Sequence, residues 1–134
     1  MMKRLRAALV VVLLASAAMP STASAHTEFD HSEPADGDEV DQPAAEIVVA
    51  FTDTVEPVGA GFEVLDPSGT ILSPEVVTDD DTVFTLLLDP PLAGGTVGVR
   101  YEVMAGDGHV QTGGFSFTVA AAPPTTTTAA PSTT

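Results

Sequence analysis

The sequence contains no cysteine, and only 4 of its 134 residues are lysine or arginine. The lack of cysteine excludes disulfide bonds, thiolate metal sites and cysteine nucleophiles, so any bound metal must be held by nitrogen and oxygen atoms. Methionine is also scarce, because Met104 is the only one beyond residue 25. A metal site built from several thioether groups is therefore excluded from that part of the chain.

Most of the scarce positive charge lies at the very start of the chain. Three of the four basic residues occur within the first six positions, an uncharged apolar run covers residues 7–18, and Ala-Ser-Ala occupies 23–25. This order predicts a secretory signal peptide over residues 1–25, cleaved after Ala25, so that His26 begins the mature protein. The apolar run is too short to span a bilayer core of about 30 Å as a helix. The alternative is an uncleaved N-terminal anchor.

Cleavage at this site would leave a very acidic protein. Arg100 would be the single basic residue against all 19 acidic ones, giving a net charge of −18. Such a charge repels phosphate backbones and anionic membrane surfaces, so we expect no nucleic-acid binding and no membrane insertion after cleavage. It attracts cations, although a solubilising role or adaptation to a salty exterior explains the charge equally well.

The alternation of side chains predicts an all-β protein. Apolar residues recur with period two in the segments 46–51, 62–64, 83–88, 97–103 and 115–119. No amphipathic helix is evident. Asp-Pro-Ser-Gly at 66–69 predicts a tight turn, and Pro90-Pro91 and Gly94-Gly95 bracket another connection. About seven short strands at this spacing indicate an immunoglobulin-like β-sandwich.

The chain divides into three parts. The signal peptide is followed by one sandwich domain over residues 26–119, which is long enough for a modest core. Residues 120–134 consist almost entirely of alanine, proline and threonine and offer no large apolar side chain to bury. We predict that this segment is a low-complexity disordered tail or surface spacer.

Two histidines occupy positions that could bind a metal. As a mature N-terminus, His26 would offer both a free amine and its imidazole, which can chelate one ion; a solvated terminal histidine is the alternative. In Asp107-Gly108-His109, an extended backbone would project the carboxylate and the imidazole to the same side. The alternative for this tripeptide is an ordinary Asp-Gly hairpin turn with a solvated histidine.

Together these residues supply one amine, two imidazoles and one carboxylate. A nitrogen and oxygen set of this kind suits Cu(II), which favours square-planar or tetragonal ligation, better than Zn(II), Mg(II) or Ca(II). His31 lies an odd number of residues from His26 and would face the other side of a regular strand. We expect His31 to be solvated, and Asp53 is a distant candidate for a supporting acid.

The motifs resemble those of the CopC family of exported copper-resistance proteins over nearly all of residues 26–119. The similarity begins with His26 and is carried by Ser-Glu-Pro-Ala-Asp-Gly at 32–37 and by the segments 49–53, 91–103, 107–109 and 114–119. The resemblance implies a Greek-key β-sandwich and a Cu(II) site formed by His26, Asp107 and His109. It also implies a role in copper storage, buffering or hand-over.

The sequence departs from the family pattern in three respects. It lacks the methionines for the Cu(I) site that some members carry, and Met104-Ala105-Gly106 replaces the usual Val-Ser-Ala before the Asp-Gly-His motif. In addition, no membrane segment follows the tail, so fusion to a transporter is not seen.

The sequence therefore predicts a periplasmic or extracellular binding protein that is not an enzyme. It would be a monomer with one Cu(II) ion per chain, and a membrane copper transporter is a candidate partner. Because the nitrogen donors must lose protons to bind, affinity for Cu(II) should fall below about pH 6.

One alternative function is that of a metal-free surface module. The other is a copper monooxygenase, which is disfavoured because Asp107 would fill the position needed by oxygen and because the few aromatic residues fall mostly at core-facing positions.

Overall fold

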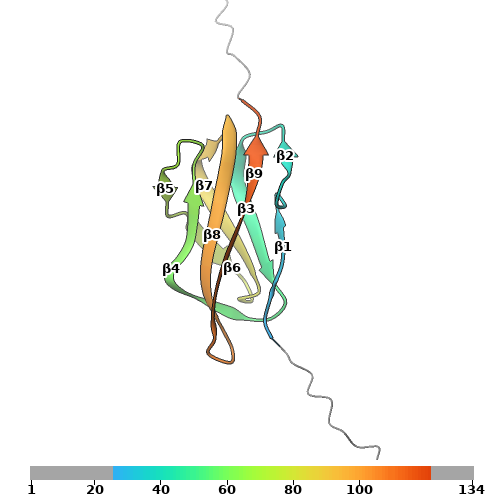
Figure 1. Cartoon of the computed structure of the whole chain (residues 1–134), viewed down its shortest axis with the longest axis vertical. Coiled ribbons are helices and arrows are strands. Elements are labelled where there is room, and N and C mark those ends of the chain that lie inside the picture. The colour runs from blue at the N-terminus through green and yellow to red at the C-terminus, as the bar shows by residue number, and fades with distance from the viewer. Residues whose placement is uncertain (1–25, 122–134) are drawn as a thin grey trace, which may run out of the picture.

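The computed structural model describes residues 26–121. The predicted signal peptide and most of the predicted tail therefore lie outside the described residues. Residues 26–121 form nine strands and no helix, arranged as two sheets packed face to face (Figure 1). The prediction of an immunoglobulin-like Greek-key β-sandwich is confirmed. This part of the chain accordingly holds no helix that is long and apolar enough to cross a membrane.

The first sheet has four strands in the order β1-β3-β7-β6. Its members are β1 (Phe29–Glu33), β3 (Ala44–Phe51), β7 (Val83–Leu92) and β6 (Glu75–Thr78), and all neighbours are antiparallel. Strand β1 forms one edge of this sheet, so β3 is its only partner strand.

The second sheet has five strands in the order β2-β9-β8-β4-β5. They are β2 (Glu39–Val40), β9 (Val110–Val119), β8 (Gly95–Ala105), β4 (Val55–Leu65) and β5 (Ile71–Leu72). Strands β8 and β9 form a long antiparallel hairpin whose loop lies at the end of the molecule where the described chain begins (Figure 1). The end of β9 lies at the opposite end of the sandwich.

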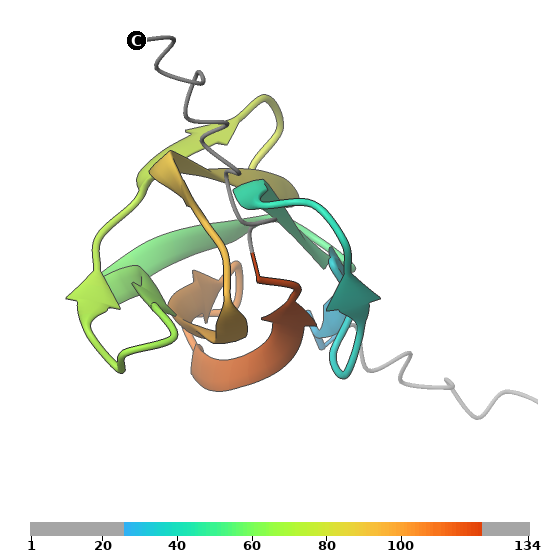
Figure 2. The same cartoon turned by 90° about the horizontal axis from the view of Figure 1, so that it is seen from above.

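The core forms between the two sheets, which enclose it from both sides in the end-on view (Figure 2). Alternation along β8 places Val97, Val99 and Val103 inside, each at most 1% exposed, while Arg100 points outward. Burying an apolar side chain of this size contributes about 1.5–3 kcal/mol. The largest fully buried side chains come from both sheets: Phe84, Phe117, Ile47, Leu86, Val49, Val64, Val97, Val99, Val103 and Val119.

Two details differ from the strands expected from the sequence. The described chain has nine strands instead of about seven, because β2 and β5 are two-residue strands too short to show alternation. Pro90 and Pro91 lie inside β7 instead of at a boundary, and the connection to β8 consists of Ala93 and Gly94. The Asp66–Gly69 turn forms as predicted, with the Gly69 amide donating to the Asp66 carbonyl at 2.8 Å and Gly69 at φ +84°.

An aromatic cluster fixes the start of β1 against the second sheet. The ring of Phe29 stacks on Tyr101 at 5.8 Å and lies 5.9 Å from the ring of Phe115. It also meets Phe51 edge-on at 6.3 Å. Aromatic pairs of this kind contribute about 0.5–1.5 kcal/mol each beyond the area they bury. The cluster therefore anchors the chain only three residues after His26.

The aromatic cluster depends on the absence of a side chain at Gly113. A Cβ atom at this position would overlap the Tyr101 hydroxyl and would lie 3.0 Å from Tyr101 Cε1. Because neighbouring rings hold Tyr101 in place, we expect Gly113→Ala to destabilise the fold by about 1–3 kcal/mol in chemical denaturation. Gly106→Ala is the control, since a Cβ there meets nothing within 4 Å. Equal stability of the two variants would show that the cluster is not tightly packed.

Candidate metal centre

The candidate site lies at one end of the sandwich, where the β8–β9 loop meets the segment before β1 (Figure 1). Residues 106–109 form the loop, which contains Asp107 and His109. His26 comes from residues 26–28, which we call the N-terminal arm. These two segments are far apart in the sequence and adjoin strands of different sheets, β1 in the first and β8 and β9 in the second. The fold thus brings the predicted ligands to one place.

The β8–β9 loop is a tight turn and not the extended segment that the sequence analysis expected. The Gly108 amide donates to the Ala105 carbonyl and the Ala105 amide to the His109 carbonyl, both at 2.9 Å. Gly108 has φ +87°, a conformation that favours glycine. The expectation of an extended backbone was therefore wrong, because the Asp-Gly pair favours chain reversal.

The turn nevertheless brings the side chains of Asp107 and His109 together. Asp107 Oδ2 lies 3.0 Å from His109 Nδ1, and Asp107 Oδ1 accepts the His109 backbone amide at 3.0 Å. The backbone hydrogen bond from His109, and then its side-chain hydrogen bond, hold the pKa of Asp107 below its ordinary value of 3.8. Asp107 is therefore a carboxylate throughout the physiological pH range.

His26 approaches the same carboxylate from the N-terminal arm. Its Nδ1 atom lies 4.0 Å from Asp107 Oδ2, and its side chain is 68% exposed. The two imidazoles thus flank Asp107, which is the centre of the candidate site. Among residues 26–121, no three His, Cys, Asp or Glu side chains are already arranged to hold a metal ion. The exposed His26 side chain is free to turn and would have to adjust to share an ion with the other two.

The secondary candidates from the sequence have local partners of their own. His31 Nδ1 lies 2.7 Å from Asp30 Oδ2 on β1, and the His31 side chain is 62% exposed. Asp53 accepts the Thr54 amide at 2.7 Å, which stabilises the turn before β4. Each of these groups therefore has a structural partner on the surface.

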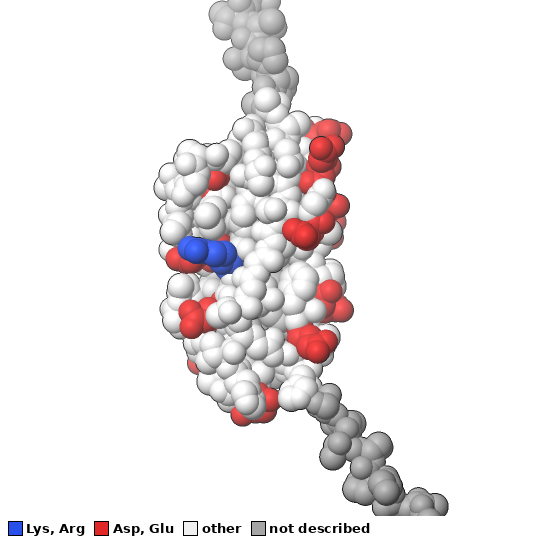
Figure 3. All heavy atoms as spheres, in the orientation of Figure 1, with Lys and Arg blue, Asp and Glu red and all other residues white. Residues whose placement is uncertain are grey.

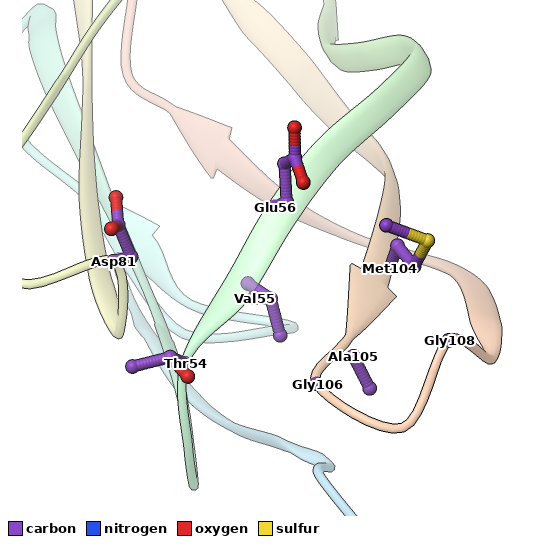
Figure 4. A pocket seen from close by; sticks show the side chains of 8 residues that line it. All are labelled: Thr54, Val55, Glu56, Asp81, Met104, Ala105, Gly106 and Gly108. Carbon is purple, nitrogen blue, oxygen red and sulfur yellow. The ribbon is translucent and has the colours of Figure 1, made fainter.

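A shallow cavity of about 340 Å³ adjoins the β8–β9 loop (Figure 4). Met104 and Glu56 occupy opposite positions on β8 and β4 at its border. The cavity holds no histidine, and its remaining lining residues are Thr54, Val55, Asp81, Ala105, Gly106 and Gly108. Met104 therefore lies near the end of strand β8, just before the β8–β9 loop that contains Asp107.

On the face shown in Figure 3, acidic side chains are spread along the length of the domain. Arg100, the sole basic residue beyond residue 25, is paired with Glu63 at 2.9 Å. No Lys or Arg in the described part of the chain is therefore left to repel a cation near Asp107.

Sequence reasoning missed one polar contact at this site. Gln111, two residues after His109, donates a hydrogen bond from Nε2 to the carbonyl oxygen of Thr27 in the N-terminal arm. A lone glutamine in a strand gives no sequence signal for such a contact. Only the fold shows that Gln111 of β9 and Thr27 are neighbours.

These features define a class: a small all-β sandwich domain with two histidines flanking a carboxylate at one end. The chain belongs to the CopC family, since the model of the CopC domain matches residues 29–120. Asp107 and His109 lie inside the matched region, and His26 lies three residues before it. No curated protein matches the chain.

Solved structures support this assignment. The chain is similar to CopC from Methylosinus trichosporium OB3b, with 27% identity and a TM-score of 0.62 over 73% of this chain and 97% of the other. It also shares the fold of PcoC, described as a methionine-rich copper resistance protein from Escherichia coli. That match has 24% identity and a TM-score of 0.55, and it covers 71% of this chain and 99% of PcoC.

Proposed function

We propose that this protein is exported, is cleaved after Ala25 and then holds one Cu(II) ion through His26, Asp107 and His109. It would act as a monomeric binding protein, not an enzyme, in copper storage, resistance or delivery to a partner such as a membrane copper transporter. The observation that carries the proposal is the approach of His26 to Asp107, at 4.0 Å, beside His109. Membership of the CopC family supports copper as the metal.

The chemistry of the donors supports the same choice. The contact between His109 Nδ1 and Asp107 favours the tautomer that leaves Nε2 of His109 available to a metal. The low pKa of Asp107 keeps a negative charge beside a bound cation. With the amine and imidazole of His26, these groups make a nitrogen-rich set, which among divalent ions favours Cu(II).

A titration with Cu(II) tests this proposal directly. For protein that begins at His26, we expect calorimetry to give one ion per chain, and electron paramagnetic resonance (EPR) to show several nitrogen donors. Affinity should fall below about pH 6, because protons compete with the ion for the nitrogen donors. Asp107 contributes no proton uptake in this range, because its pKa is lowered from 3.8. Failure to bind Cu(II) at pH 7.5 would refute the proposed function.

A further inference from the structure

The N-terminal arm needs support if His26 is to stay near Asp107. Strand β1 begins only at Phe29, so residues 26–28 have no place in the strand pairing of either sheet. Chain ends of this kind are poorly ordered unless specific contacts hold them. The contacts of Thr27 and Glu28 therefore decide how well His26 is positioned.

One set of contacts ties the arm to the loop after β3. The Glu28 amide donates to Thr52 Oγ1 at 2.9 Å, and the Thr52 amide donates to the Glu28 carbonyl at 2.9 Å. These bonds form only while the arm lies against the domain, and they come from the sheet that does not carry Asp107 and His109. They leave the distance between the arm and the β8–β9 loop undetermined.

The contact on the other side comes from Gln111 of β9. Gln111 is half-buried and lies opposite the fully buried Val103 in the β8–β9 ladder, so its side chain faces the interior. Its Nε2 donates to the carbonyl oxygen of Thr27, and Thr27 is only 6% exposed. This bond joins the strand that follows His109 directly to the residue that follows His26.

We propose that Gln111 is a positioning residue that clamps the N-terminal arm against β9 and so holds His26 beside Asp107 and His109. This inference rests on the proposed function for its effect on copper. A ligand held close to its bound position before the ion arrives loses less conformational freedom on binding. Residues that orient metal ligands without touching the metal typically account for about 10–100-fold in affinity.

The test compares Gln111→Met, which keeps the length of the side chain but removes the donor, with Thr112→Val. Thr112 is exposed, lies next to Gln111 and points to the opposite face of β9, so it is a matched control. Gln111→Glu is a second donor-free variant of nearly the same size, for use if the methionine variant does not fold.

The first readout is hydrogen exchange of the Glu28 amide in metal-free protein. Without the clamp we expect this amide to exchange at least about tenfold faster, because the arm opens more often, while amides in β8 keep their rates. Unchanged exchange of Glu28 in a folded variant would overturn the clamp. This readout does not involve copper, so it stands even if the wild type binds none and the proposed function fails.

The second readout is Cu(II) binding by protein that begins at His26. We expect Gln111→Met to lower the affinity about 10–100-fold and to change the EPR spectrum toward fewer nitrogen donors. Thr112→Val should leave both unchanged. A merely structural role for Gln111 would lower the melting temperature without altering the EPR spectrum, and that result would also overturn the proposal.

Discussion

Adding a single glycine ahead of His26 is expected to weaken Cu(II) binding by more than about 100-fold. The added residue converts the α-amine of His26 into an amide and moves the free amine to the preceding glycine. His26 then no longer carries an amine and an imidazole on the same residue, so the chelate ring between these two groups is lost. Groups that merely orient ligands account for about 10–100-fold, so the loss of this chelate should exceed this range.

The measurement is a competition titration against a chelator of known affinity, using protein that begins at His26 and protein with the extra glycine. Both retain all three side chains, so a difference reports whether the terminal amine must lie on His26 itself. A glycine added after Thr134 is the control and should leave affinity unchanged. Equal Cu(II) affinity with and without the N-terminal glycine would rule out the amine as a ligand.

The fold could be predicted because the sandwich depends on long strands with clear alternation. Val97, Val99 and Val103 alternate with outward residues, and the structure buries all three. The strands that were missed are short: β2 and β5 span two residues each, and β6 spans Glu75–Thr78. They form because they pair with the longer strands β9, β4 and β7, and this tertiary pairing cannot be read from the local sequence.

The candidate site was predictable in its residue types but not in its geometry. Asp107 and His109 do converge at 3.0 Å, but across a glycine turn and not along an extended strand. The approach of His26 depends on how two sheets pack, and so does the bond from Gln111 to Thr27, which spans 84 positions. Contacts between residues so far apart in the sequence follow from the complete fold and cannot be predicted from the spacing of residues within a motif.

The second large effect is expected for His109→Ala, which should lower the affinity for Cu(II) by more than about 100-fold while leaving the fold intact. The side chain of His109 is 78% exposed, so its removal opens no cavity and should change stability by less than about 0.5 kcal/mol. The backbone amide at position 109 still donates to Asp107 Oδ1. The turn is therefore retained, and the change isolates the loss of one imidazole.

His31→Ala is the matched control for this prediction. His31 is similarly exposed at 62%, and it pairs with a neighbouring aspartate, Asp30, at 2.7 Å, as His109 pairs with Asp107 at 3.0 Å. Both substitutions remove an exposed imidazole and its contact with a neighbouring carboxylate. Only His109, however, shares its carboxylate with His26. If His31→Ala weakened Cu(II) binding as strongly as His109→Ala, copper would be recognised by surface histidines in general, and the site centred on Asp107 would be wrong.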